Sequence, residues 1–440
     1  MKTHVILLAL GMAASASAYA QQPSMVDSLH SMKASSTKVV YIDGKPETEE
    51  ARRSDLDSIK KVIGDFYYDQ FRNFQDPDAP YFLFMSKEAG LALGVGGGVR
   101  LRAFYDWNGA MPNNSFAPMQ IPIPPDPTSM KHFGTTPSGT YLFFRAMGHN
   151  TALGNYQLYV EGNFTGYNGR DFKLKKAYAM IRDFTFGYAA STFSDPAAEP
   201  AIIDAAGANN KMGVTSLLVR YMPTFKKHWS VGVSVETPAT FVAADNVDTK
   251  AVSCWMPDFA ALVQYQWARG QHVRLSGIVR TLPYRDLKTG TNHNRVGWGL
   301  QLSSVTHPVS NLTTYLTFNY GKGYGGLTGD LTYGNYDLVG DPNRPGTLYA
   351  PAAFGWCAGL QYNFSPTVFA TIAASETRYL PQHTVAPDEY KYGIFACANV
   401  FWYITPRVYA AAEIDWGQRK NFSGEHRHAN RANISAGFTF

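Results

Sequence analysis

The stretch that decides the fold is the last of the chain, Asn430-Arg431-Ala432-Asn433-Ile434-Ser435-Ala436-Gly437-Phe438-Thr439-Phe440. From Ala432 onward, apolar side chains occupy every second position, and small or polar side chains occupy the positions between them. This alternation gives a strand one apolar and one polar face, which suits a wall between lipid and water. The sequence therefore predicts a strand that closes a membrane barrel. Phe438 and Phe440 are predicted to be the signal read by the barrel assembly machinery.

The chain from residue 91 onward repeats this alternation. The segments that we expect to be strands are 92–107, 140–149, 155–165, 172–182, 184–192, 212–223, 228–237, 258–268, 271–282, 293–305, 310–321, 354–364, 367–378, 390–403, 405–418 and 430–440. Short turns alternate with long connections, among them 108–139, 193–211, 238–257 and 322–353. This plan is typical of bacterial outer-membrane barrels, so we predict an all-β membrane protein, an antiparallel transmembrane β-barrel of about 16 strands over residues 91–440.

The amino-terminal residues carry an export signal. Lys2 precedes a short apolar run, and Ala18-Tyr19-Ala20 fits a signal peptidase site, so residues 1–20 are predicted to be a cleaved signal peptide. The alternative is an uncleaved anchor, but the run is far shorter than the roughly 20 residues of a spanning helix. Residues 21–80 lack the alternation and are predicted to be a periplasmic extension with an amphipathic helix at about 47–74. Oligomerisation through this helix and plugging of the lumen by the extension both stay open.

The composition excludes several classes of protein. The chain is 45% hydrophobic with a mean hydropathy of -0.22, and no uncharged apolar run after the signal is long enough for a spanning helix. Aromatic residues at 14% and 39 glycines favour a barrel over a soluble protein. The net charge of +5 is too small to indicate nucleic-acid binding. Three cysteines, Cys254, Cys357 and Cys397, do not predict a disulfide framework.

Strand phase assigns the charged side chains to the lumen, because a charge facing the bilayer midplane costs roughly 2–4 kcal/mol. The predicted pore-lining and solute-binding residues are Arg100, Arg102, Lys173, Lys175, Arg220, Arg274, Arg280 and Arg295. Basic side chains around a pore favour anions. The alternative is a general diffusion pore, in which these charges only hydrate the wall and pair with its carboxylates.

The segment 193–211 is the third long connection. In barrels of this kind we expect it to fold inward and narrow the pore, with Asp195, Glu199 and Asp204 facing the basic wall. The alternative is an exposed surface loop.

Three segments resemble a known family. Tyr156–Phe164, Leu174–Tyr178 and Gly187–Asp195 resemble the third to fifth strands and the constriction-loop entry of the DcaP-like trimeric porins. The resemblance is close in these segments and architectural over the rest of 91–440. It implies a homotrimeric outer-membrane channel for small anions, often dicarboxylates, with trimer contacts through strands in 92–192. Residues 21–80 depart from the family, whose heptads are clearer.

Motifs for enzymatic chemistry are weak. Gly94-Val95-Gly96-Gly97-Gly98 lacks the Lys-Ser/Thr of a phosphate loop. Glu425-His426-Arg427-His428 contains metal-ligand types, but a solvated turn is the expectation there. We therefore predict a channel for passive uptake of small hydrophilic solutes, preferably anions, with no cofactor, no metal site and no enzymatic activity. A plugged structural or adhesive barrel and a barrel enzyme stay as alternatives.

Overall fold

The computed structural model describes residues 25–43, 80–86, 90–111, 114–150, 152–166, 169–238 and 247–440. The predicted signal peptide 1–20 and the predicted amphipathic helix 47–74 lie outside the described residues. Within those ranges, no helix has both the length and the apolar character needed to cross a membrane.

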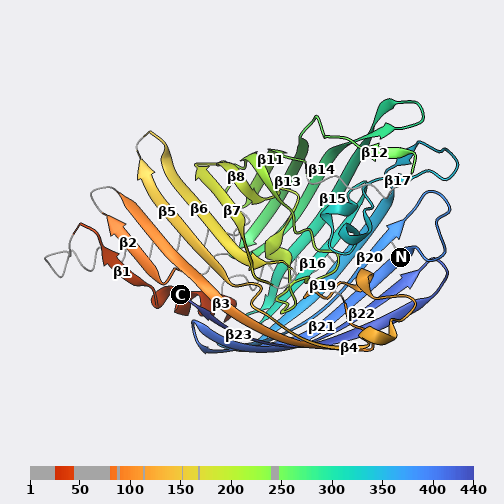
Figure 1. Cartoon of the computed structure of the whole chain (residues 1–440). Coiled ribbons are helices and arrows are strands. Elements are labelled where there is room, and N and C mark those ends of the chain that lie inside the picture. The colour runs from red at the N-terminus through yellow and green to blue at the C-terminus, as the bar shows by residue number, and fades with distance from the viewer. Residues whose placement is uncertain are drawn as a thin grey trace.

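Sixteen long antiparallel strands in the described part of the chain form a closed barrel (Figure 1). They are β3 (Leu91–Trp107), β5 (Tyr141–Asn150), β6 (Gly154–Thr165), β7 (Asp171–Ile181), β8 (Phe184–Ala190), β9 (Thr215–Tyr221), β11 (Trp229–Glu236), β13 (Asp258–Ala268), β14 (Gln271–Asp286), β15 (Thr291–Val309), β16 (Leu312–Lys322), β19 (Ala352–Ser365), β20 (Val368–Leu380), β21 (Tyr390–Thr405), β22 (Val408–Asn421) and β23 (His426–Thr439). Each strand pairs with the next, and β23 returns to β3. The predicted fold class is confirmed.

The seam between β23 and β3 closes the barrel. Their register runs from Asn430 opposite Trp107 to Thr439 opposite Gly98. Beyond it, the Phe440 N–H donates to the Gly97 carbonyl and the Gly97 N–H donates to the Phe440 carbonyl, both at 2.9 Å. The short strand β2 (Phe82–Ser86) continues along the same edge of β3, and β1 (Lys38–Tyr41) adds to β2 in parallel. Along this edge of β3, Phe440 therefore lies between the residues that pair with β2 and the residues that pair with β23.

The two faces of the wall differ as the alternation predicts. On β15, Val296 and Leu300 are 66% and 49% exposed, whereas Gln301 between Leu300 and Leu302 is only 3% exposed. Exposed aliphatic and aromatic side chains continue on the outward face of the other strands. A closed barrel with an apolar outer surface and a polar interior is built for lipid outside and water inside. The protein belongs in the bacterial outer membrane, as predicted.

Smaller elements complete the described part of the chain. They are α2 (Met25–Ser35), β4 (Lys131–Thr136), β10 (Thr224–Phe225), β12 (Thr249–Ala251), β17 (Val339–Gly340), β18 (Leu348–Tyr349) and the 3-10 helices η1 (Pro118–Gln120), η2 (Pro127–Ser129), η3 (Pro196–Ala198), η4 (Gly325–Leu327) and η5 (Leu331–Gly334).

Two features of the barrel, strand β4 and the turn between β21 and β22, differ from what the sequence predicts. The segment 108–139 was expected to be a loop, but β4 lies in it. Because β5 pairs only with Leu91–Gly98, the second half of β3 needs another partner, and β4 supplies it. The turn between the expected strands 390–403 and 405–418 lies further along the chain, at Pro406-Arg407, after the end of β21. Proline has no N–H to donate to a ladder, so it suits the turn.

Helix α2 is attached to the rim that carries the short turns, which is the periplasmic rim in barrels of this plan. Arg407, in the turn between β21 and β22, donates from Nε to Ser36 Oγ at 2.7 Å and from a terminal nitrogen to the Lys33 carbonyl at 3.2 Å. The Lys33 ammonium lies 5.2 Å from the centre of the Tyr403 ring. These contacts place the last turn of α2 against the mouth of the lumen on the side of the short turns.

The seam predicts the effect of shortening the chain. Deletion of Phe440 removes the two backbone hydrogen bonds to Gly97, which contribute about 1–3 kcal/mol if each contributes about 0.5–1.5 kcal/mol. We expect a several-fold lower yield of the compact barrel band on unheated denaturing gels. Phe364→Ala, which removes an outward phenyl ring and leaves the seam intact, serves as the control. A normal barrel yield after the deletion would contradict the role of Phe440.

Candidate functional site

The third long connection, residues 191–214 between β8 and β9, is here named L3. L3 lies inside the barrel, where Phe193 and Ala198 are 0% exposed and Ile203 is 1% exposed. Buried polar groups of L3 contact three separate parts of the wall: β14 and β15, then β3, β22 and β23, and finally β20. L3 therefore crosses the lumen.

The first contact of L3 is made by Asp195. Its carboxylate lies 2.8 Å from His272 Nε2 and 3.2 Å from an Arg274 terminal nitrogen, both on β14. Ser303 on β15 donates to the same carboxylate at 2.5 Å. Burial acts to raise the pKa of Asp195, but the Arg274 guanidinium and His272 outweigh it and hold the pKa well below its usual range. Asp195 is therefore an anionic anchor.

The second contact lies on β3, β22 and β23. Asp204 is 2.6 Å from Arg102 and 3.0 Å from Arg431. Glu413 accepts the backbone N–H groups of Ile203 and Asp204 at 2.6 and 2.7 Å. Burial acts to raise the pKa of Asp204, but Arg102 and Arg431 lower it overall. Paired buried charges of this kind are costly to break, so they fix the position of the loop.

The third contact is made by Asn209 and connects L3 to another loop. Its backbone N–H donates to Ser375 Oγ at 3.1 Å, and Thr377 donates to its carbonyl at 2.9 Å. Its side-chain nitrogen donates to Asp330 at 3.0 Å. Asp330 belongs to the connection between β16 and β19 and also accepts from the Tyr390 hydroxyl at 3.0 Å. L3 is thus tied both to β20 and to a second loop within the barrel.

Asp330 is the meeting point of the long loops. Besides Asn209 and Tyr390, the backbone N–H of Met119, in the connection between β3 and β4, also acts to lower the pKa of Asp330. Arg419 on β22 bonds the Met119 carbonyl at 2.9 Å and contributes a nearby positive charge. Burial raises the pKa of Asp330 from 3.8 to about 7, and the hydrogen bonds oppose that shift only in part. The loop junction therefore contains a carboxyl group that titrates near neutrality.

A cavity of about 610 Å³ lies between L3, the wall and α2. The charged side chains that line it are Lys33, Arg100, Lys175, Lys211, Glu161, Glu199 and Asp204. Lys175 is 2.7 Å from Glu161, and Lys211 is 2.6 Å from Glu199. Arg100 instead bonds the Ser435 hydroxyl at 3.2 Å and the Ile203 carbonyl. A solute in this cavity meets both positive and negative side chains. Of the cations, Arg100 bonds neutral acceptors.

The eight predicted pore-lining cations have different surroundings in the structure. Arg100 and Lys175 line the cavity. The buried guanidiniums contact protein groups: Arg102 contacts Asp204, Arg274 contacts Asp195, Arg280 contacts Asp258 and Asp337, and Arg220 bonds the Ala190 carbonyl. Arg295 bonds the Leu348 carbonyl, and Lys173 is exposed beside Asp171. Their roles in solute binding remain predictions.

The three acidic residues predicted to face the basic wall, Asp195, Glu199 and Asp204, also differ in their contacts. Asp195 and Asp204 contact the basic wall, as expected, while Glu199 pairs with Lys211 of its own loop. Lys33, Lys211 and Asp330 did not appear among the candidate residues. They lie in segments without strand alternation, so no phase rule assigns them to the lumen.

Comparisons with known proteins agree with this geometry. No model of a protein family matches the chain, and no curated protein sequence matches it. Among solved structures, the outer membrane channel DcaP of Acinetobacter baumannii matches with a TM-score of 0.68 and 18% identity, over 81% of this chain and 99% of that one. The protein has the fold of an outer-membrane porin. This confirms the resemblance to DcaP-like porins at the level of the fold.

Other porins match less closely. An anion-selective porin from Comamonas acidovorans gives a TM-score of 0.54 at 10% identity, over 80% of this chain and 100% of that one. OmpT of Vibrio cholerae, in a trimer form, gives 0.51 at 11% identity, over 80% and 100% of the two chains. At these identities the likeness establishes the shared porin fold.

The anchoring of L3 predicts the effect of removing Asp204. Asp204→Ala leaves Arg102 and Arg431 without their loop carboxylate, and breaking a buried pair in this way costs about 3–5 kcal/mol. We expect a higher and noisier single-channel conductance in a planar bilayer. The control is Asp126→Ala, because among the described residues Asp126 bonds local groups at Thr128 and Ser129 in the exposed loop. Unchanged conductance in Asp204→Ala would show that this contact does not position the loop.

The raised pKa of Asp330 predicts a pH dependence of loop packing. Below pH 3.8 the carboxyl is neutral whether the loops are packed or open, so their packing is strongest there. As pH rises from 3.8 to about 7, only the open form ionises freely, and packing weakens until Asp330 itself ionises in the packed form. Hydrogen exchange of amides 323–338, corrected for intrinsic rates, should accelerate across this window. Asp330→Asn should abolish that change, and an equal change in the variant would exclude Asp330 as its source.

Proposed function

We propose that the protein is a channel for passive uptake of small hydrophilic solutes across the outer membrane, and that it favours anions such as dicarboxylates. It acts in this proposal as a channel and not as an enzyme. The observation that carries the proposal is the position of Arg100 in the lining of the cavity between L3 and the wall. The porin fold supports the channel function, and Arg100 supports the preference for anions.

Arg100 differs from its neighbour on the same face of β3. Arg102, two residues further along, contacts the Asp204 carboxylate, so much of its charge is balanced within the protein. The Arg100 guanidinium bonds a hydroxyl and a backbone carbonyl, which are neutral acceptors. A partly exposed guanidinium with neutral partners keeps its full charge toward the solute path, and low-dielectric walls focus that field.

The two lysine pairs of the cavity supply further binding groups. Lys175 is 45% exposed, and Lys211 is 34% exposed, so both ammonium groups are open to solvent while paired with Glu161 and Glu199. The Lys211–Glu199 pair is partly exposed on both sides, and pairs of this kind contribute little stability, so a carboxylate of a passing solute competes with it at low cost. In the other pair only Lys175 is exposed, because Glu161 is 5% exposed. A dicarboxylate has two groups and can engage Arg100 and one lysine together.

The second candidate is a general diffusion pore. It is favoured by the same lining, because Glu161, Glu199 and Asp204 offset much of the basic charge around the cavity. The two candidates differ in the role of Arg100. In a general pore its charge only hydrates the wall, and neutral sugars pass as readily as anions of equal size.

We also propose a homotrimer that assembles through the outward faces of the early strands. Leu142, Leu158, Phe184 and Phe186 are 43–50% exposed on this side of the barrel, and burial against a neighbouring copy would remove apolar surface from lipid contact. Outer-membrane lipid and the barrel assembly machinery are the other proposed partners. The terminal Phe440 at the seam is the proposed recognition element for assembly.

Replacement of Arg100 tests the anion preference. Arg100→Gln removes one charge, and a unit charge about 4 Å from an ion is worth about 1 kcal/mol even at the dielectric constant of water. We expect the anion-to-cation permeability ratio, measured from the reversal potential in a salt gradient, to fall about fivefold. Succinate entry into liposomes should slow more than that of a neutral sugar. Lys288→Gln is the matched control, since Lys288 carries the same charge on an exposed site beside Asp248 and is not among the predicted pore-lining residues. Equal ratios in both variants would favour the general pore.

A further inference from the structure

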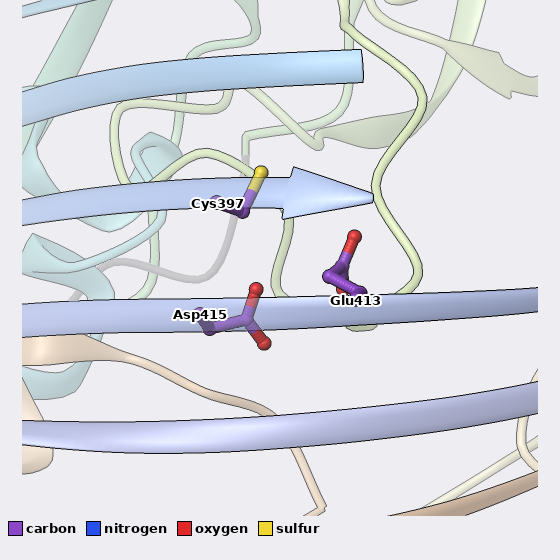
Figure 2. Close-up of side chains that lie close together, drawn as sticks. All are labelled: Cys397, Glu413 and Asp415. Carbon is purple, nitrogen blue, oxygen red and sulfur yellow. The ribbon is translucent and has the colours of Figure 1, made fainter. Parts of the chain in front are cut away.

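Three potential metal ligands meet on the lumen face of β21 and β22. Cys397, Glu413 and Asp415 place one ligand atom each within 4.8 Å of one another (Figure 2). Cys397 lies directly opposite Asp415 in the strand register, and Glu413 is two residues before Asp415, on the same face of β22. One oxygen of each carboxylate points toward the strand that carries Cys397 (Figure 2). The positions are fixed by the pairing of two strands in the barrel wall.

The cluster contains an unsatisfied buried group. Asp415 is 0% exposed, and its Oδ2 atom accepts from Asn433 at 2.7 Å. Its Oδ1 atom is buried and has no hydrogen-bond partner among the described residues. Cys397 is 7% exposed and is a free thiol. Buried carboxylates are normally hydrogen bonded, paired with a cation or bound to a metal, and Oδ1 lacks such a partner among the described residues.

The surrounding charges also leave a place for a cation. Four buried carboxylates gather in this part of the wall, those of Asp106, Asp204, Glu413 and Asp415. The guanidiniums that contact them are Arg431, which bonds Asp106 and Asp204, and Arg102, which bonds Asp204. Among the described residues, these two guanidiniums contact Asp106 and Asp204 of this set, whereas Glu413 and Asp415 accept hydrogen bonds from neutral backbone and asparagine N–H groups. A divalent cation between Glu413 and Asp415 would supply a positive partner for these two carboxylates.

We propose that Cys397, Glu413 and Asp415 form a binding site for a divalent cation that accepts thiolate, with Zn²⁺ as the ion. Zinc binds cysteine sulfur and carboxylate oxygen, and three protein ligands leave a fourth position for water. Magnesium and calcium prefer more ligands and only oxygen, so the thiol argues against them. On binding, the sulfur exchanges its proton for the zinc ion, and the proton leaves to solvent without any redox change.

The site would act on the constriction through Glu413. The same carboxylate accepts the N–H groups of Ile203 and Asp204, so it belongs to both the cluster and the second anchor of L3. Zinc at this position would add positive charge behind the loop. Binding itself does not depend on which solutes the channel carries.

Direct metal binding tests the proposal. The full chain, purified in detergent and stripped with a chelator that is then removed, is dialysed against ZnCl₂ and analysed for bound metal. The exposed His426 and His428 are replaced by Ala in every sample, because they offer an unrelated surface site. We expect one zinc ion per chain, and cobalt in its place should give a sulfur-to-metal charge-transfer band. Cys397→Ser and Asp415→Asn should each weaken zinc binding at least tenfold, and Cys397→Ser should remove the band.

The control is Cys357→Ser, which removes another buried free thiol from the lumen face of the wall. It should keep both the stoichiometry and the band. Heat-modifiable migration on gels confirms that each variant is a folded barrel, and Asp415→Asn provides a second test if Cys397→Ser folds poorly. The proposal is overturned if zinc does not bind, if Cys397→Ser and Asp415→Asn bind it as the parent does, or if Cys357→Ser removes it equally.

Discussion

The absence of water from the hydrocarbon interior of a membrane is the constraint on which this structure depends. Each backbone N–H and C=O group there must find its partner within the protein, and a sheet meets that demand only when its first and last strands pair. The seam of β23 on β3 does this along ten register pairs and ends in the reciprocal bonds between Phe440 and Gly97. Once the sheet is closed, side chains have only two destinations, lipid or lumen. The alternation of the sequence follows from that choice.

Closure also creates an interior that the strands cannot fill alone. A wall with a polar inner face surrounds a space into which arginines, aspartates and glutamates project, and these groups need partners. The long loops provide them, since Asp195 meets Arg274, Asp204 meets Arg102, and Asp337 meets Arg280. Buried ion pairs are weak evidence of stability, because desolvation offsets much of their attraction. Their effect here is positional: each pair is satisfied by only one placement of its loop.

The sequence predicted the strands well because strand alternation is local. Sixteen strands, their order and the two faces follow from residues that are neighbours in the chain, and the observed ends differ from the predictions by a few residues. The phase rule likewise placed Arg102, Arg274 and Arg280 inward. The loop group that each of these side chains contacts depends on the strand register and on the paths of the long loops across the lumen. Neither of these can be recognised from neighbouring residues in the sequence.

Elements without alternation were missed for the same reason. Strand β4 exists because β5 pairs with only half of β3, which is a property of the assembled sheet. The position of α2 depends on Arg407, far along the chain, and Asp330 gains its raised pKa only where three segments bury it. Periodicity cannot report such long-range contacts.

The division between charges that hold loops and charges that face solute has a consequence for selectivity. A count of inward arginines overstates the basic character of the lumen, because most of these guanidiniums are buried against protein groups. Arg100 and Arg102 show the difference, since they share a strand and a face, yet one bonds neutral acceptors and the other bonds a carboxylate. The path of L3 decides this assignment, because Ile203 and Asp204 are consecutive in the loop and meet the two arginines in turn. The same two loop amides are held by Glu413, which also belongs to the cluster with Cys397 and Asp415. The segment Ile203-Asp204 therefore contacts both Arg100, which sets the electric field in the cavity, and Glu413 in the wall behind the loop.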